Sequence, residues 1–173
     1  MEKNIPYPGI RESLLRLKEA GKVLCVATSK PEPFARSIAE RFGLTDCFDF
    51  IGGATLDTAR TKKAEVIDYV LASVGAPEPE QVLMVGDRRH DVEGAAAFGI
   101  DCVGVLYGYG SREELTAAGA CYLAEQPSDV ADYVLGGFSK EDEALVKEAC
   151  EHAAEAAAEI LTDGPDKAMN DFN

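Results

Sequence analysis

The stretch Gln81–Asp91, which reads QVLMVGDRRHD, decides the fold class of this chain. Its first half is a continuous apolar run of the length of one β-strand, and the glycine that follows opens a charged, helix-like segment. A strand that is apolar on both faces is typical of a parallel sheet covered by helices on both sides. We therefore predict a fully buried parallel strand over residues 81–86 and a helix over residues 88–99.

The segments on either side of this stretch repeat the alternation of strand and helix. Residues 22–28 (KVLCVAT) form a second apolar run of strand length, between helical patterns at residues 8–21 and 31–43. The same reading predicts strands at 48–51, 101–106 and 121–124, and helices at 61–74, 111–119 and 128–135. Strands that alternate with helices at this spacing need crossover connections, so they predict an α/β fold with a doubly wound parallel sheet.

Composition narrows the class of partner. The chain has 173 residues, 46% of them hydrophobic, and 31 acidic against 17 basic side chains, for a net charge of −14. This is enough apolar material for a core, and the negative charge argues against nucleic acid or an anionic membrane as partner. No run approaches the roughly 20 apolar residues of a membrane helix, and the start MEKNIPYP lacks the apolar core of a signal peptide. Five cysteines without a C-x-x-C pair indicate reduced thiols, so we expect a cytoplasmic protein.

The last part of the chain differs in charge from the rest. Residues 138–173 hold 10 acidic and 3 basic side chains, a net charge of −7. Alanine and glutamate dominate residues 139–161, which predicts one long helix. We therefore predict a core domain over residues 1–135 and an acidic helix and tail over residues 136–173. The helix either packs on the flank of the domain or mediates dimerisation or partner binding.

Candidate site residues follow the two strongest predicted strands, because parallel sheets bind ligands beyond the carboxyl ends of their strands. Thr28 and Ser29 follow the first strand, where a hydroxyl and free backbone N–H groups could hold a phosphoryl oxygen. Asp87 and Asp91 follow the second strand and could place two carboxylates on one crevice, a donor set that suits Mg²⁺. The plain alternatives are that Thr28 merely ends a strand and that Asp87 caps the following helix.

Lys62 and Lys63 begin a predicted helix, where a cation opposes the helix dipole. Such a placement indicates a nearby anion, unless both lysines are a solvated surface pair. His90 lies beside Asp91 and His152 lies in the alanine-rich segment. We interpret both histidines as surface residues rather than catalytic bases.

The order of these features resembles motifs two, three and four of the haloacid dehalogenase superfamily: a threonine after a strand, a lysine at a helix start, and Gly-Asp-x-x-x-Asp. The stretches VATSKPE (26–32), GGATLD (52–57), KAEVI (63–67) and GVLYGYGS (104–111) are similar to its phosphoglycolate-phosphatase-like branch. The resemblance covers roughly residues 6–135. It implies a Rossmann-like core and a Mg²⁺-dependent phosphatase acting on a small phosphorylated metabolite, such as phosphoglycolate or a nucleotide.

The same resemblance implies roles for individual residues. Thr28, with Ser29, would bind the phosphoryl group, and Lys63 would neutralise its charge. Lys63 is preferred to Lys62 because the family pattern runs Lys-Ala-acid-Val-Ile. Asp87 would ligate Mg²⁺. Asp91 would either bind the metal through a water molecule or position Asp87 as its neighbour.

The sequence departs from the family in one respect: it contains no Asp-x-Asp-x-Thr motif. In the family this motif ends the first strand and supplies the nucleophilic aspartate and the general acid/base. The resemblance therefore implies an N-terminally truncated core without most of the cap domain, close to inactive as this chain alone. The absent strand would lie between the strand that ends at Thr28 and the one that ends at Gly86. We expect those two strands to pair directly, or a partner copy or complementing segment to supply the strand.

A different class of function stays open at this stage. The chain could be a non-catalytic phosphate- or partner-binding module that associates through its C-terminal helix. An Asp-x-Asp-x-Thr segment that restores hydrolysis would favour the enzyme, whereas a stable oligomer without such activity would favour the binding module.

Overall fold

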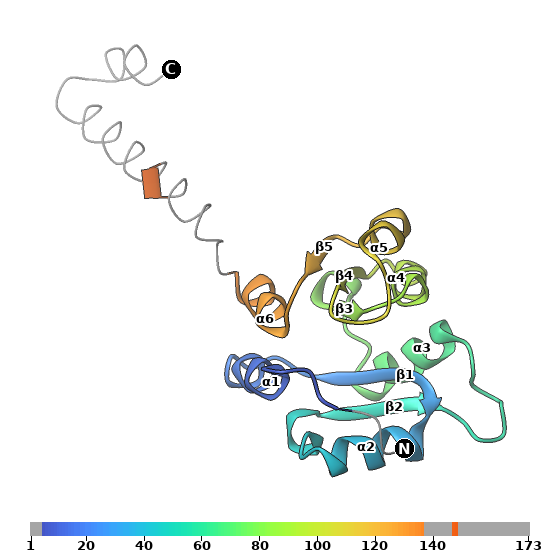
Figure 1. Cartoon of the computed structure of the whole chain (residues 1–173). Coiled ribbons are helices and arrows are strands. Elements are labelled where there is room, and N and C mark those ends of the chain that lie inside the picture. Colours follow the sequence, from blue (N-terminus) through green and yellow to red (C-terminus); the bar gives the residue numbers. More distant parts are fainter. Residues whose placement is uncertain (1–4, 137–146, 149–173) are drawn as a thin grey trace. The chain divides into compact units, whose positions relative to one another are not determined.

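The computed structural model of the chain describes residues 5–136, 147 and 148 (Figure 1). The chain divides into two units, residues 1–135 and residues 136–173. The predicted helix over 139–161 lies outside the described residues except for Lys147 and Glu148, so it stays a prediction, as does its role in association. Among the described residues, no helix combines the length and the apolarity that crossing a membrane would take.

The first unit alternates helices and strands in the predicted order, and every strand pair in it is parallel. The α/β fold class predicted from the sequence is thereby confirmed. The elements are α1 (Ile10–Glu19), β1 (Cys25–Pro31), α2 (Glu32–Arg41), β2 (Phe50–Ala54), α3 (Lys63–Ser73), β3 (Leu83–Gly86), α4 (Arg89–Ala96), β4 (Asp101–Val105), α5 (Arg112–Ala118), β5 (Tyr122–Ala124) and α6 (Pro127–Leu135). Short 3₁₀ helices at Thr45–Cys47 and Pro79–Gln81 lead into β2 and β3.

Helix α5 illustrates how local sequence sets the ends of an element. Ser111 is its N-cap, and the Ser111 hydroxyl accepts a hydrogen bond from the Glu114 N–H at 3.2 Å. Gly119 ends the helix with a φ of 94°, a left-handed conformation that favours glycine. Serine before and glycine after the apolar pattern are the signals from which the sequence predicts this helix.

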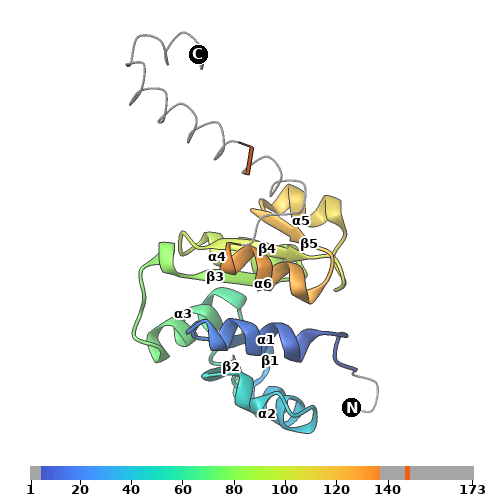
Figure 2. The ribbon, with the colours of Figure 1, turned by 90° about the vertical axis from the view of Figure 1, so that its left-hand side faces the viewer.

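The strands form two separate sheets rather than one. β1 pairs with β2, with Cys25 opposite Phe50, and β3 pairs with β4, which also pairs with β5. Within the described residues no ladder joins β1 to β3, and the two sheets stand apart in both views of the fold (Figures 1 and 2). The expectation that the strands ending at Thr28 and Gly86 pair directly is therefore wrong for this structure.

The first strand begins later than the apolar pattern predicts. The apolar pattern predicts a strand over residues 22–28, whereas β1 covers Cys25–Pro31. The Leu24 N–H donates to Asp49 Oδ2 at 2.9 Å, and the Asp49 N–H donates to Leu24 O at 2.8 Å. The Lys22 N–H donates to Leu17 O at 3.1 Å, which closes the end of α1. These bonds engage the backbone of residues 22–24 before the register with β2 begins.

Burial is concentrated on the sheet that contains β4. Val103 is fully buried in β4, and apolar residues of α4 and α5 pack against this strand. By contrast, Val85 in β3 is 41% exposed and Val23 before β1 is 67% exposed. The prediction that both apolar runs are fully buried is wrong, because among the described residues neither β1 nor β3 has a paired strand on its second edge.

Helices, not strand pairing, hold the two sheets together. α3 packs against β1, β2 and α4, whereas α1 packs against α6. An ion pair of 2.7 Å between Arg16 of α1 and Asp132 of α6 adds to the second contact. The two sheets are therefore bridged on two sides by pairs of packed helices.

Candidate functional site

The carboxyl ends of β1 and β3 border one pocket of about 370 Å³. The pocket brings together the five residues singled out from the sequence: Thr28, Ser29, Lys63, Asp87 and Asp91. They come from the end of β1, the first turn of α3 and the start of α4. Parallel α/β sheets bind ligands at this edge, so the pocket lies where the strand pattern of the sequence predicts a ligand site.

Lys63 is the first residue of α3 and points into this pocket. Its Nζ lies 2.9 Å from Asp91 Oδ1 and donates to Ala27 O at 2.5 Å. The side chains of Lys63 and Asp91 are only 15% and 14% exposed. The anion expected near this helix start is therefore Asp91, and Lys63 is not part of a solvated surface pair. Lys62 is exposed and does not line the pocket.

Asp91 uses both carboxylate oxygens within the structure. While Oδ1 faces Lys63, Oδ2 accepts hydrogen bonds from the backbone N–H groups of Asp87 at 3.0 Å and Arg88 at 3.1 Å. These N–H groups lie at the beginning of α4, where helices leave donors unsatisfied. The capping role that the sequence suggested for Asp87 thus belongs to Asp91, which also fixes the turn that carries Asp87.

Asp87 lies directly after β3 and is held by the loop that follows β4. Its Oδ2 accepts a hydrogen bond from the Tyr109 N–H at 2.9 Å. A Cβ added to Gly108 would lie 2.2 Å from Asp87 Cβ, and one added to Gly110 would lie 2.1 Å from Asp87 O. Only glycine permits such an approach, so Gly108 and Gly110 are site residues that the sequence reasoning did not assign. The sequence feature that could have indicated these two glycines is the Gly-Tyr-Gly run directly after a buried strand.

Thr28 and Ser29 lie where β1 leaves its regular register with β2. The Thr28 hydroxyl oxygen accepts a hydrogen bond from the Lys30 N–H at 3.2 Å. This bond uses a lone pair of the oxygen and leaves the hydroxyl hydrogen available for a ligand. Ser29 is exposed at the mouth of the pocket.

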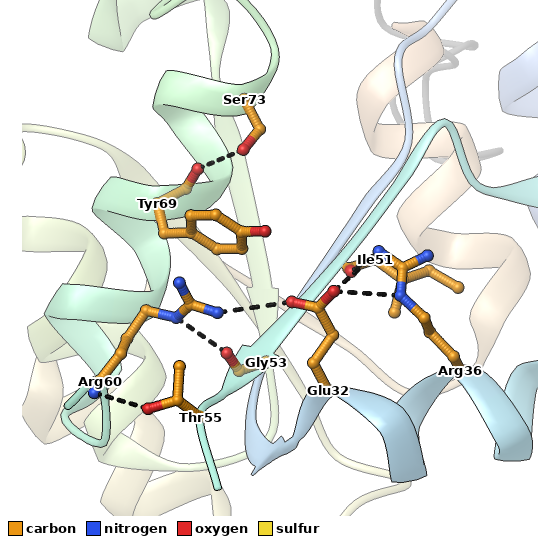
Figure 3. A network of polar contacts seen from close by, with 8 residues as sticks. All are labelled: Glu32, Arg36, Ile51, Gly53, Thr55, Arg60, Tyr69 and Ser73. Atoms are coloured by element: carbon orange, nitrogen blue, oxygen red, sulfur yellow. Dashed lines mark hydrogen bonds and ion pairs between the residues drawn. The ribbon is translucent and has the colours of Figure 1, made fainter. Parts of the chain in front are cut away.

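A polar network holds the loop that leads from β2 into α3 (Figure 3). Arg60 Nε donates to Gly53 O at 2.9 Å, and Arg60 Nη2 lies 3.4 Å from Glu32 Oε2. The Arg60 guanidinium also lies 3.5 Å from the centroid of the Tyr69 ring, the geometry of a cation–π contact. Arg60 therefore ties its loop to β2, α2 and α3 at once. Lys63, three residues later, starts from a fixed backbone.

Two further side chains border the pocket but are engaged with other groups. Arg88 Nε forms an ion pair of 2.9 Å with Glu114 Oε1 of α5. His90 Nδ1 lies 3.5 Å from Glu93 Oε2, and its side chain is 61% exposed. His90 thus lies on the surface at the rim of the pocket, as the sequence predicts.

Two tyrosines, Tyr7 and Tyr107, pack against each other and interact electrostatically with Asp87. The rings of Tyr7 and Tyr107 meet edge to face, with centroids 4.9 Å apart. Burial raises the pKa of Tyr107 to about 12, and burial followed by the charge of Asp87 raises the pKa of Tyr7. Both phenols are therefore protonated at neutral pH and add no negative charge to the site.

The carboxylates fit a magnesium ion that keeps most of its water. Among the residues that the structure describes, no three His, Cys, Asp or Glu side chains are grouped for one metal ion. Mg²⁺ is commonly held by one or two carboxylates, and waters and substrate phosphate complete its shell. Asp87 has one carboxylate oxygen beyond the hydrogen bond from Tyr109, whereas Asp91 is engaged on both. Asp87 is therefore the better placed of the two as a direct ligand.

Comparison with known proteins identifies the family of the chain. Residues 2–105 match the family described as haloacid dehalogenase-like hydrolase. The chain belongs to this family. A peptidyl-tRNA hydrolase family also matches residues 121–173, but the described part of that range is mainly β5 and α6 of the haloacid dehalogenase-like unit. That second match covers less than half of the chain and adds no site residue.

Curated relatives in this family carry several names. The chain is 50% identical over 110 residues to the tyrosine-protein kinase PtkA of Mycobacterium tuberculosis, which covers 64% of this chain and 38% of the relative. It is 47% identical over 115 residues to a 5′-nucleotidase of Pseudomonas aeruginosa, and this match covers 66% of the chain and 52% of the relative. It is 35% identical over 132 residues to a phosphoglycolate phosphatase of Pseudomonas putida, and this match covers 76% of the chain and 45% of the relative. The chain thus spans about half or less of these relatives' own lengths.

A solved structure confirms the fold. A predicted phosphatase from Clostridium acetobutylicum superposes with a TM-score of 0.73 at 40% identity, covering 75% of this chain and 60% of that one. The parallel sheets and flanking helices of residues 5–136 are therefore those of a haloacid dehalogenase-like hydrolase, as the motifs indicated.

Proposed function

We propose that residues 5–136 are the phosphate- and Mg²⁺-binding part of a haloacid dehalogenase-type phosphatase that acts on a small phosphomonoester. The observation that carries the proposal is the pocket in which Lys63, Thr28 and the two aspartates meet at the ends of β1 and β3. A largely buried lysine, a free hydroxyl hydrogen and a carboxylate with an open oxygen suit a phosphoryl group and its counter-ion.

Each residue has a distinct role in this proposal. The Thr28 hydroxyl, with Ser29 beside it, binds phosphoryl oxygens, and Lys63 neutralises their charge from the other side of the pocket. Asp87 ligates Mg²⁺, which when bound supplies positive charge to the phosphoryl oxygens. Asp91 positions Lys63 and the backbone of Asp87 through its two engaged oxygens, and reaches the metal at most through water.

The chain by itself is proposed to turn over substrate very slowly or not at all. Covalent phosphoryl transfer in this family starts from an aspartate of the Asp-x-Asp-x-Thr motif, which the sequence does not contain. Without the nucleophile, positioning and charge neutralisation remain, but the first step of that route does not. A segment that supplies the motif is expected to give Mg²⁺-dependent hydrolysis of p-nitrophenyl phosphate.

The substrate class follows from the pocket and the relatives together. Relatives named 5′-nucleotidase and phosphoglycolate phosphatase favour a small phosphorylated metabolite, and a pocket of about 370 Å³ is of a size for a phosphate and a short carbon skeleton. The relative named tyrosine-protein kinase also fits a phosphoryl-binding pocket. Free Cys25, Cys47, Cys102 and Cys121 support a cytoplasmic setting.

The metal assignment is tested by thermal denaturation with and without MgCl₂. The native chain is expected to gain stability from Mg²⁺, since binding to the folded state alone raises the melting temperature. Asp87→Asn removes the charge of the direct ligand and is expected to abolish this shift. His90→Ala changes a surface residue of the same pocket rim and is expected to leave the shift intact.

Two results would overturn the assignment. An equal response of both variants would show that Asp87 has no special part in metal binding. A native chain that Mg²⁺ and orthophosphate together do not stabilise would refute the site as a whole.

A further inference from the structure

Two residues near the end of β1 leave the register with β2, beside the candidate phosphate-binding groups. Thr28 pairs with Gly53, and Pro31 pairs with the residue that follows Gly53. The two residues between Thr28 and Pro31 therefore form a bulge in the ladder. A bulge changes the direction of the side chains that it carries, and bulges are frequent next to active sites. We call Thr28, Ser29 and Lys30 the β1 bulge.

The β1 bulge lies directly on the backbone of Gly53. A Cβ added to Gly53 would lie 2.5 Å from Lys30 O and 2.8 Å from Glu32 N. A real Cβ atom does not approach backbone atoms so closely, so a side chain at this position would push the bulge away from β2. The position of the bulge therefore depends on the backbone of Gly53, with no side chain between them.

Glu32, the first residue of α2, fixes the end of this segment with both carboxylate oxygens (Figure 3). Its Oε1 accepts a hydrogen bond from Arg36 Nη2 at 2.9 Å, and its Oε2 accepts one from Arg60 Nη2 at 3.4 Å. Arg36 Nη2 also donates to Ile51 O of β2 at 2.8 Å. The side chains of Glu32 and Arg60 are each 20% exposed, so solvent and salt screen their ion pair less than a surface pair.

Arg60 contacts the end of the bulge, the strand beside it and the helix that carries Lys63. Besides its bond to Glu32, Arg60 donates from Nε to Gly53 O at 2.9 Å. Its guanidinium lies 3.5 Å from the centroid of the Tyr69 ring, and Tyr69 belongs to α3, which begins at Lys63. A planar guanidinium suits this place, because its N–H groups point outward in one plane while its face stacks on a ring.

The loop that carries Arg60 is closed by its own hydrogen bonds. The Thr55 N–H donates to Arg60 O at 3.0 Å, and the Arg60 N–H donates to Thr55 Oγ1 at 3.0 Å. Between them, Thr58 has a φ of 64°, a left-handed conformation that a β-branched residue rarely adopts. Such conformations persist where the surrounding structure fixes them, and they are frequent at functional sites. The loop thus keeps Arg60 in place against the preference of Thr58.

We propose that Arg60 is a positioning residue for phosphate binding. It sets the position of the β1 bulge, which carries the Thr28 hydroxyl, relative to α3, which carries Lys63. This inference rests on the proposed function, since it requires that Thr28 and Lys63 bind the same phosphoryl group. Arg60 does not line the pocket, so it acts on the ligand through these other residues.

The metal-binding side of the pocket is held by different contacts. Asp87 accepts a hydrogen bond from the Tyr109 N–H, and Asp91 accepts hydrogen bonds from the N–H groups of Asp87 and Arg88. None of these three bonds involves Arg60 or its loop. Loss of Arg60 is therefore expected to weaken the binding of phosphate and to spare the binding of Mg²⁺. A general loss of folded structure would weaken both, so the comparison separates positioning from overall stability.

The test measures the apparent dissociation constants of orthophosphate and of Mg²⁺ for the full chain by isothermal titration calorimetry. Orthophosphate is titrated at a MgCl₂ concentration that saturates the native chain, and MgCl₂ is titrated without phosphate. Arg60→Met keeps an apolar stem beside Tyr69 but removes the N–H donors. It is expected to weaken orthophosphate binding about tenfold or more and to change Mg²⁺ binding by less than about twofold. Circular dichroism checks that each variant is folded.

Two comparison variants accompany Arg60→Met. Arg60→Lys keeps the positive charge but has no planar fork, so it cannot bond Gly53 O and Glu32 together and is expected to weaken orthophosphate binding about threefold or more. This milder variant carries the test if Arg60→Met does not fold. Arg16→Met removes an arginine from a different ion pair, the one with Asp132 at 2.7 Å, and is expected to bind both ligands as the native chain does.

Glu32→Ala tests whether Arg60 acts through the β1 bulge. It removes the acceptor of the Arg60 ion pair and is expected to weaken orthophosphate binding in the same way as Arg60→Met. The variant with both changes is expected to lose little more than Arg60→Met alone, because both changes break the same contact. Losses that multiply in the double variant would show that the two residues act independently and would contradict the proposal.

Three further results would overturn the inference. Native-like orthophosphate binding by Arg60→Met would show that the bulge keeps its position without Arg60, and would leave the proposed function intact. Equal losses of orthophosphate and Mg²⁺ binding would show that Arg60 only stabilises the fold. A native chain that binds neither ligand would refute the proposed function and this inference with it.

Discussion

At the scale of single residues, the contrast between two adjacent lysines is the sharpest test of the pocket. Lys63→Met keeps the aliphatic stem but leaves the nearly buried Asp91 without its ion-pair partner at 2.9 Å. We expect the free energy of unfolding to fall by about 1–3 kcal/mol, because an unpaired carboxylate pays its desolvation without compensation. Lys62→Met, at an exposed position, is expected to change it by less than about 0.5 kcal/mol. Urea denaturation measures the free energy of unfolding of both variants. An equal loss of stability in the two variants would contradict the ion-pair interpretation.

The sequence predicted which residues gather at the site but not how each is used. Position after apolar strands was enough to select Thr28, Ser29, Asp87 and Asp91, because parallel strands end at one edge. It could not show that Asp91 spends its oxygens on Lys63 and on two backbone N–H groups. Nor could it show that Gly108 must be small, since that follows from a contact with Asp87 across the sheet. Such pairings depend on three-dimensional distances between elements that are far apart in the chain.

At the scale of elements, Asp49 joins α1, the segment before β1 and the start of β2. It accepts a hydrogen bond from the Leu24 N–H at 2.9 Å and pairs with Lys18 Nζ at 3.0 Å. The Leu24 bond, and then Lys18, lower the pKa of Asp49. A carboxyl group with a lowered folded-state pKa stabilises fully above its unfolded value of about 3.9, and this stability is lost as pH falls through the folded pKa.

Asp49→Asn is therefore expected to lower the melting temperature at pH 7, and the difference from the native chain should shrink at pH 3. Asp68→Asn is the control, since Asp68 is exposed on α3 and makes no hydrogen bond or ion pair with any described residue. Its melting temperature should follow that of the native chain at both pH values. Thermal denaturation by circular dichroism gives all six values. A constant Asp49→Asn deficit across pH would show that packing, not charge, causes the loss.

The order and type of the elements were predictable because each has its own local signal, such as Ser111 before α5 and Gly119 after it. The residues at which each element begins and ends were less predictable. The apolar run at 22–28 contains residues whose backbone is taken by Leu17 and Asp49, so β1 starts only at Cys25. The apolar runs also predict that β1 and β3 are fully buried, whereas Val23 and Val85 in these runs are exposed. An apolar run indicates which contacts a strand is suited to make, whereas its burial depends on whether a neighbour is present.

At the scale of the whole domain, the candidate site is divided between the two sheets. Thr28 and Ser29 belong to the sheet of β1, and Asp87 and Asp91 follow β3 of the other. Lys63 connects the two through Ala27 O and Asp91. The relative position of Thr28 and the two aspartates therefore depends on side chains and packed helices.

This division predicts how the domain unfolds. In the part of the chain that the structure describes, no ladder joins β1 to β3 and couples the two sheets, so each sheet should open with its own free energy. β4 is paired on both sides and carries the most buried side chains, so its amides should be the most protected. Native-state hydrogen exchange at increasing urea is expected to release β1 and β2 amides at lower urea than β4 amides. Identical opening free energies for β1 and β4 would mean that the packed helices alone already couple the two sheets fully.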